Sequence, residues 1–224
     1  MRQAFAAAAL LLAAGCYDVQ TFDAGPYVLD DFEDGDFLPS DPIFDAWTCF
    51  AFNPSSNKMY SCDHDAGAHN SDYALSLDFT VTDPANGTQQ DGGAGLVSLA
   101  AKPMDFSHFE ELDFEVSLAS GNPALSSEAQ LQVELGCSTA PDEDGNVPGN
   151  FYVSRGAAYE MGWQPRRLTL TNFALPDWVT ATPIAGGLAG CLSRIDSIRF
   201  SVDAKVPDGQ VGQGFLRIDD ITLR

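Results

Sequence analysis

Apolar and polar residues alternate along much of this chain with a repeat of two. The stretches 73–81 (YALSLDFTV), 112–118 (LDFEVSL) and 130–135 (QLQVEL) set large apolar side chains against small or polar ones. The segments 167–171 (RLTLT) and 197–203 (SIRFSVD) repeat the pattern. A period of two is that of a strand with one face in a core and one in water. Each stretch is therefore predicted to be an antiparallel β-strand.

Turn-forming residues separate these predicted strands. Asn, Asp, Gly and Pro gather at 83–93, 120–127, 141–150 and 205–214. Outside the N-terminal apolar run no stretch keeps a helical period, although Ser107 could cap a single turn. About nine or ten strands with long connections predict an all-β fold, a two-sheet antiparallel β-sandwich of the jelly-roll type.

The first sixteen residues have a different composition. A positive Arg2 precedes an apolar run from Ala4 to Ala14, and small residues lead to Cys16. This is the pattern of an export signal, and the run is too short to span a membrane as a mature helix.

The end of this run, LAAGC, resembles a bacterial lipobox, the motif at which the signal is cut before a cysteine that then receives lipid. The resemblance implies a signal peptide over 1–15 and a lipidated Cys16. The polar stretch that ends in Gly25-Pro26 predicts a tether over 16–26 and a folded domain over 27–224. The protein would be an exported bacterial lipoprotein held at a membrane. The alternative is an ordinary signal peptide cut near Ala14, which leaves a free thiol.

Charge narrows the possible partners. The 224 residues include 11 Lys+Arg and 32 Asp+Glu, a formal net charge of −21. Such a field repels nucleic acid and anionic lipid headgroups, so no nucleic-acid partner is expected. It suits divalent cations and neutral ligands, and it also serves solubility alone. We expect a monomer.

Five cysteines remain to be assigned. If Cys16 carries lipid, four cysteines remain: Cys49, Cys62, Cys137 and Cys191. An even number of cysteines in an exported chain predicts that they pair, here as two disulfides. Four cysteines allow three pairings. We favour Cys49 with Cys62, which closes a local loop, and Cys137 with Cys191, which ties distant strands.

Pairs of aspartates lie in the first and last predicted strands, 28–33 (VLDDFE) and 216–223 (LRIDDITL). Chain ends of a domain are often close in space, so these acids are predicted to gather. Gathered carboxylates repel one another, and Ca²⁺ relieves the repulsion. Neighbouring strand residues point to opposite faces, so we expect one acid of each pair, plus Glu33, to bind metal. The other acids should accept backbone hydrogen bonds. The alternative is that all are turn-capping acids without an ion.

Several segments in order resemble the galactose-binding-like jelly rolls, in particular family-11 carbohydrate-binding modules and complex-I-intermediate-associated domains. The matching segments are 30–36 (DDFEDGD), 71–79 (SDYALSLDF), 103–116 (PMDFSHFEELDFEV), 162–173 (GWQPRRLTLTNF), 192–202 (LSRIDSIRFSV) and 218–223 (IDDITL). In several such modules an ion lies between the first and last strands. The resemblance therefore implies a structural Ca²⁺ at Glu33 and Asp220, with Asp31, Asp36 and Asp219 as further ligands.

The same resemblance implies a sugar site on one concave sheet, where aromatic rings stack on pyranoses and polar groups bond hydroxyls. Candidates are aromatic or Arg side chains on the polar side of strands or beside the Cys49–Cys62 loop, together with the Trp that follows a proline in 174–178 (ALPDW). They are Tyr152, Arg155, Tyr159, Trp47, Tyr60 and Trp178.

Three functions follow from these patterns. The first is a non-catalytic carbohydrate-binding lipoprotein of the cell envelope with a structural calcium, whose partner is a polysaccharide or glycan. The second is a structural or protein-interaction lipoprotein with the same fold and no sugar site. The third is a glycosidase that uses two carboxylates. Nucleophile-elbow, zinc-protease and phosphate-loop motifs are absent from the sequence, so we expect no enzyme.

Overall fold

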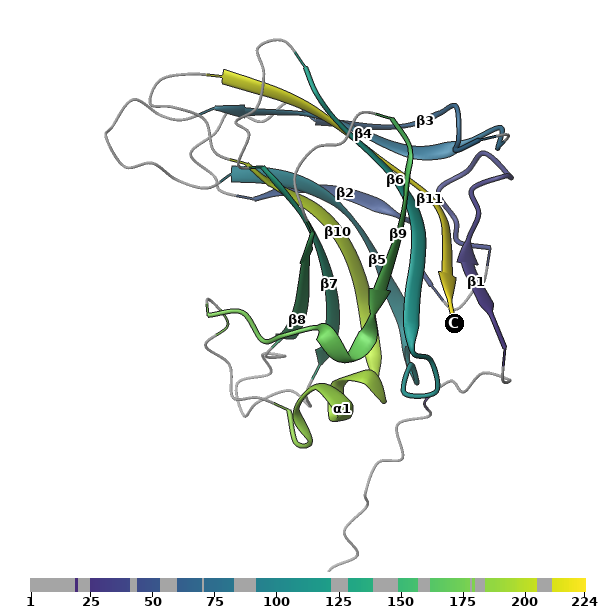
Figure 1. Ribbon diagram of the computed structural model, residues 1–224, viewed down its shortest axis with the longest axis vertical. Helices are drawn as coiled ribbons and strands as arrows, with labels where there is room; N and C mark the ends of the chain where they lie inside the picture. Colours follow the sequence, from purple (N-terminus) through teal and green to yellow (C-terminus); the bar gives the residue numbers. More distant parts are fainter. Residues whose placement is uncertain are drawn as a thin grey trace, which may run out of the picture.

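The chain forms two antiparallel sheets packed face to face (Figure 1). The computed structural model describes residues 19, 25–40, 44–52, 60–69, 71–82, 92–121, 129–138, 149–156, 162–177, 179, 184–204 and 211–224. It leaves undescribed the side chains of residues 52, 60–62, 82, 92, 101, 138, 149, 150, 155 and 156. Eleven strands lie within the described residues, so the predicted all-β sandwich is confirmed and has slightly more strands than expected.

Six strands form one sheet, with β1 and β4 sharing one edge of the long last strand. The members are β3 (Tyr60–Asp65), β4 (Ala74–Thr82), β11 (Val211–Leu223), β6 (Glu111–Ser120), β9 (Gln164–Thr169) and β1 (Tyr27–Asp30). In Figure 1 this sheet forms the outer layer of the bent sandwich.

Five strands form the second sheet, which lies on the inside of the bend (Figure 1). In spatial order they are β2 (Thr48–Phe52), β5 (Gly92–Met104), β10 (Ile195–Ala204), β7 (Gln130–Ser138) and β8 (Gly149–Gly156). The outer surface of this sheet is thus the concave side of the molecule. Alternation does not predict β5, because its glycines and alanines hide the period of two.

The core fills the space between the sheets with the apolar side chains of the alternating strands. Leu75, Leu77 and Phe79 of β4 are buried, as the alternation predicts. The ring of Phe114 from the outer layer meets that of Phe200 from the inner layer edge to face at 5.0 Å. Burying one such side chain stabilises the fold by about 1.5–3 kcal/mol, so this seam holds the two sheets together.

The first and last strands are neighbours, as the terminal acids predict. β1 runs beside the end of β11 (Figure 1). Tyr27 lies opposite Leu223, and Val28 lies opposite Thr222. The register of β11 shifts after Asp219, and Asp220 there has a φ of 51°. β4 pairs with β11 up to Ile218, and after the bulge β1 pairs with the same edge of β11 from Ile221 to Leu223.

Helical structure is short. A six-residue helix, α1 (Gly187–Leu192), precedes β10, and a 3₁₀ turn (Leu170–Asn172) ends the stretch predicted as a strand over 167–171. Cys191 of α1 forms a disulfide with Cys137 of β7, as predicted. Within the described segments, no helix is long and apolar enough to cross a membrane.

Cys49 is also disulfide-bonded. The side chain of Cys62 lies outside the described ones, so the Cys49–Cys62 pairing stays a prediction. Cys16 and the predicted signal peptide also fall outside the described residues.

Candidate functional site

Strand register on the concave surface brings together side chains from four of the five strands, β2, β7, β8 and β10. Arg199 of β10 lies opposite Glu134 of β7, and the next row pairs Gly136 with Phe151 of β8. On the other side of β10, Phe50 of β2 lies opposite Gly95 of β5. We call the group Phe50, Gln132, Glu134, Phe151, Arg199 and Asp203 the Arg199 platform.

Two aromatic rings converge on one guanidinium at the centre of this platform. The Arg199 Cζ atom lies 4.3 Å from the centroid of the Phe151 ring and 5.9 Å from that of Phe50. Each ring reaches β10 from two strands away. Such cation–π contacts stabilise by about 0.5–1 kcal/mol at partly exposed sites. The Arg199 side chain is 30% exposed, so the cluster forms part of the surface.

Two glycines make room for the rings. A Cβ atom at Gly95 would lie 2.7 Å from Phe50 Cζ, and one at Gly136 would lie 3.2 Å from Phe151 Cε1. Each ring therefore lies close to the backbone of a glycine, where a larger residue would clash with it. The Arg199 guanidinium lies between the two rings.

Polar side chains surround the rings. Arg199 Nη1 lies 3.6 Å from Glu134 Oε2, and Gln132 Nε2 donates a 3.0 Å hydrogen bond to Asp203 Oδ2. Arg199 Nε has no hydrogen-bond partner among the described residues. Ring faces that accept an apolar surface, next to groups that bond hydroxyls, are the chemistry with which proteins bind sugars.

Two predicted ligand residues are core residues, and their assignments were wrong. Tyr152 is only 5% exposed and packs between the sheets, where burial raises the pKa of its hydroxyl. Trp47 is also buried, and its ring lies 6.0 Å from that of Phe200. Tyr152 alternates with Phe151, so its burial turns the Phe151 side chain outward.

The other predicted ligand residues cannot be placed by their side chains. The backbone of Arg155 lies opposite Gln132 in the platform, and that of Tyr60 lies in β3 on the other sheet. The side chains of both are outside the described ones, and Tyr159 and Trp178 lie outside the described residues.

Each terminal aspartate pair divides between the interior and the surface. Asp30 and Asp219 are fully buried. Asp30 accepts hydrogen bonds from the Phe32 amide at 2.9 Å and the Trp47 indole at 2.7 Å. Asp219 accepts one from the Ala68 amide at 2.8 Å. These two acids therefore hold the loops around the first and last strands.

The outward acids interact with one another. Partial burial is the main cause that raises the pKa of Asp220, and the charges of Asp31 and Glu33 raise it further. Glu33 accepts a hydrogen bond from the Ser71 hydroxyl, and Asp31 accepts one from Ser40 at 3.2 Å. We call Asp31, Glu33 and Asp220 the acidic corner.

Backbone strain gathers at this corner. The non-glycine residues with positive φ in the described part of the chain are Phe32 (55°), His69 (52°) and Asp220 (51°). A charge on His69 acts to lower the pKa of Asp220, against the larger effect of burial. Positive φ costs of order 1–3 kcal/mol at each such residue, so the surrounding contacts must hold these conformations in place.

No group of three or more His, Cys, Asp or Glu side chains within the described residues is arranged to hold a metal ion. Asp36 faces its own turn, because its carboxylate accepts the Leu38 amide at 2.5 Å. Carboxylate oxygens such as those of the acidic corner are the ligands that Ca²⁺ prefers. The calcium site therefore stays a prediction that rests on the chemistry of these residues and not on their arrangement.

The fold matches known carbohydrate-binding modules. A family-11 module of the cellulosomal cellulase Lic26A-Cel5E of Clostridium thermocellum aligns with a TM-score of 0.54 and 16% identity over 90% of this chain and 95% of that one. A second structure of a family-11 module from C. thermocellum, in complex with a β-1,3-1,4-mixed-linked tetrasaccharide, gives 0.53 and 16% over 90% and 96%. No protein-family model and no curated protein matches the sequence. The chain thus has the galactose-binding-like jelly-roll fold of these modules.

Proposed function

We propose that this protein is a non-catalytic carbohydrate-binding protein whose glycan lies on the Arg199 platform. The observation that carries the proposal is the convergence of Phe50 and Phe151 on Arg199 at the concave surface. The fold supports it, because one matching structure is a module in complex with a tetrasaccharide.

The layout of the platform indicates how the glycan lies. Phe50 and Phe151 come from the two edge strands, so a chain that touches both rings crosses the direction of the strands. Asp203 lies beside this path and can bond hydroxyls, whereas Glu134 and Gln132 are buried and hold Arg199 and Asp203 in place. Both carboxylates are already engaged by neighbours, Glu134 by Arg199 and Asp203 by Gln132. A binding role therefore suits them better than hydrolysis.

We further propose a structural Ca²⁺ at the acidic corner. Asp31, Glu33 and Asp220 would close around it on binding, because their carboxylates are not arranged around an ion in the structure. The ion would offset the repulsion from Asp31 and Glu33, which adds to the effect of burial in raising the pKa of Asp220. Asp219 and Asp36 serve the fold instead, because their carboxylates accept backbone N–H groups.

We also propose that the protein is an exported lipoprotein, anchored to a membrane of the cell envelope through Cys16. The apolar run and the LAAGC motif support this proposal. Replacing the acylated residue, Cys16→Ser, should move the protein from the membrane fraction to the soluble fraction and abolish its labelling by palmitate. Unchanged fractionation of Cys16→Ser would contradict the anchor.

A glycan array tests the binding function. The wild-type protein should bind one class of glycan, and the double variant Phe50→Ala/Phe151→Ala should lose about tenfold or more of the affinity. Tyr152→Phe is the matched control, because it changes the neighbouring buried ring and leaves the platform intact. An array on which the wild type binds nothing would overturn the proposal in favour of a structural or protein-interaction role.

A further inference from the structure

A cleft of about 530 Å³ lies on the outer surface of the six-stranded sheet, on the face opposite the platform. Its polar lining comes from β6, β9, β11 and the residue that follows β11. The residues are Asp113, Glu115, Arg166, Arg167, Asp220, Thr222 and Arg224. We call it the Asp113 cleft. Three of the 11 basic residues of this acidic chain line it, so its chemistry differs from that of the rest of the surface.

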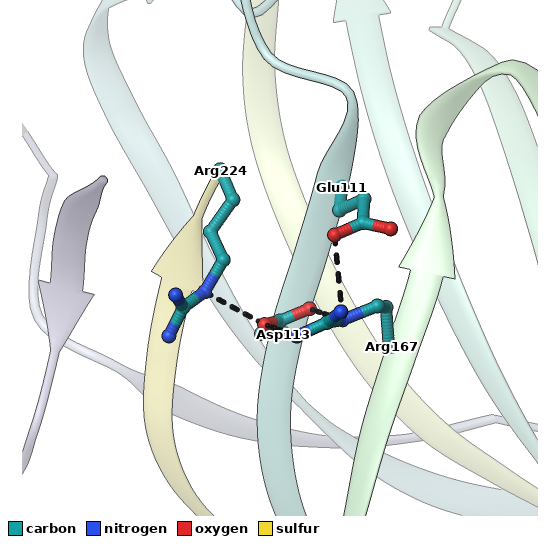
Figure 2. Close-up of polar contacts among 4 residues, drawn as sticks. All are labelled: Glu111, Asp113, Arg167 and Arg224. Atoms are coloured by element: carbon teal, nitrogen blue, oxygen red, sulfur yellow. Dashed lines mark hydrogen bonds and ion pairs between the residues drawn. The ribbon is translucent and has the colours of Figure 1, made fainter. Parts of the chain in front are cut away.

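One carboxylate holds two guanidinium groups in place here (Figure 2). Asp113 accepts two 3.0 Å hydrogen bonds from Arg167, through Nε and Nη2, and its Oδ2 lies 2.8 Å from Arg224 Nε. Glu111 adds a contact of 3.3 Å to Arg167 Nε. Charged and bidentate hydrogen bonds fix geometry well. The two arginines are therefore set in position before any ligand arrives, although their side chains are 60% and 51% exposed.

One carboxylate in the same cleft, that of Glu115, has an oxygen that accepts no hydrogen bond from the described residues. Glu115 Oε1 is 3.5 Å from His69 Nε2, whereas Oε2 is buried and has no hydrogen-bond partner among the described residues. A buried oxygen without a partner costs free energy that a donor from a ligand would recover. Thr222, which carries a hydroxyl, lines the cleft as well.

This mixture of groups selects the chemistry of the ligand. The carboxylates of Glu115 and Asp220 would repel a simple anion. The guanidinium groups would repel a simple amine, which is positively charged. A hydroxyl both donates and accepts. Neighbouring hydroxyls on one ring could therefore donate to Glu115 while they accept from Arg167 or Arg224.

We propose that the Asp113 cleft is a second saccharide-binding site, which recognises the hydroxyl pattern of a sugar rather than its apolar face. Phe114, the aromatic residue of the lining, is buried in the core and offers little ring face for stacking. The platform and the cleft lie on opposite outer faces. One molecule then joins two glycan chains, and such bivalency raises the overall avidity without any new contact.

The test uses the full folded domain with the platform disabled, so that its outcome does not depend on the platform. The Phe50→Ala/Phe151→Ala protein is titrated at millimolar concentrations with the methyl glycosides of glucose, galactose and mannose, while amide chemical shifts are followed by NMR. At least one glycoside should shift the amides of Asp113, Arg167 and Thr222. Adding Glu115→Gln should weaken that binding by about tenfold.

Glu110→Gln is the matched control, because Glu110 is exposed just before β6 and lies outside the cleft lining. It should leave the titration unchanged. If Glu115→Gln unfolds the domain, Thr222→Val, which keeps the side-chain shape and removes the hydroxyl, replaces it with the same expected loss. Amides of the cleft that no glycoside shifts, or shifts that survive these substitutions, would overturn the second site.

Discussion

The Trp47 indole donates a 2.7 Å hydrogen bond to the Asp30 carboxylate, and this contact joins the first strand to the segment that enters β2. Asp30 is fully buried. Burial raises the pKa of its carboxyl from 3.8 to about 6, against the opposing effects of the hydrogen bonds from Phe32 and Trp47. The first strand therefore carries a group that titrates close to neutral pH.

This titration predicts a fold that is more stable in mild acid than at neutral pH. The folded pKa of Asp30 lies above its unfolded value, so the folded state binds the extra proton between 3.8 and about 6. The stabilisation is present below 3.8 and is lost as pH rises through about 6. The gap between the two pKa values corresponds to about 3 kcal/mol. The pKa values of Asp219 and Asp220 are also raised, and they act in the same direction.

Urea unfolding at a series of pH values between about 4 and 8 measures this effect. Asp30→Asn should flatten the dependence on pH, because the amide does not titrate, whereas Asp177→Asn at an exposed position should not. Trp47 fluorescence in the wild type should change with a midpoint near pH 6, the folded pKa of Asp30. If the stability of Asp30→Asn depends on pH as strongly as that of the wild type, groups other than Asp30 cause the dependence.

Arg199→Lys should weaken glycan binding although it keeps the charge. A lysine ammonium cannot stack as a plane on Phe151 or bond in the same directions as a guanidinium. We expect a loss of about 0.5–1 kcal/mol in the free energy of unfolding and several-fold weaker binding. Arg194→Lys, outside the platform, is the control for the exchange itself. Equal affinity of the wild type and Arg199→Lys would mean that the guanidinium plane does not organise the rings.

The Cys137–Cys191 disulfide should contribute strongly to stability. It joins α1 to β7 across a sequence separation of 54 residues. Closing a loop of that length stabilises by about 4 kcal/mol in the chain-entropy model. The variant Cys137→Ala/Cys191→Ala should lose an amount of this order in urea unfolding. A loss below about 1 kcal/mol would show that the packing around α1 already restrains the chain.

Calcium should raise the thermal midpoint of the domain. Binding at a hundred times the dissociation constant adds about 2.7 kcal/mol, which is several degrees for a chain of this size. Asp220→Asn should abolish the response, and asparagine tolerates the positive φ at this position. In EDTA the same change should raise the midpoint, because it removes a carboxylate that Asp31 and Glu33 repel.

Asp63→Asn, at an exposed position in β3, is the control and should leave the response to calcium intact. Equal midpoints in calcium and in EDTA for the wild type would rule out the structural ion.

The sequence predicts the layers of this fold well because alternation is a local signal. Strands such as β4 and β6 show one apolar and one polar face. The division of Asp219 and Asp220 between the interior and the surface also follows locally, since neighbouring strand residues point to opposite faces. The register shift of β11 at this point does not follow from the sequence pattern.

The platform could not be predicted in the same way, because long-range register assembles it. In 151–153 (FYV) every residue is apolar or aromatic, so alternation does not say which parity faces the core. Arg199, Phe50 and Gly136 lie far apart in sequence and meet only through pairing across five strands. The burial of Trp47 could not be predicted either, since Trp47 precedes β2 and its neighbours in sequence do not alternate.

Mapping the bound glycan by amide chemical shifts tests the central claim most directly. The wild-type protein is titrated with the glycan that the array selects. The platform account predicts the largest shifts at Phe50, Phe151 and Arg199, with smaller ones at Gln132 and Glu134. Saturable binding that leaves the amides of Phe50, Phe151 and Arg199 unshifted would contradict it.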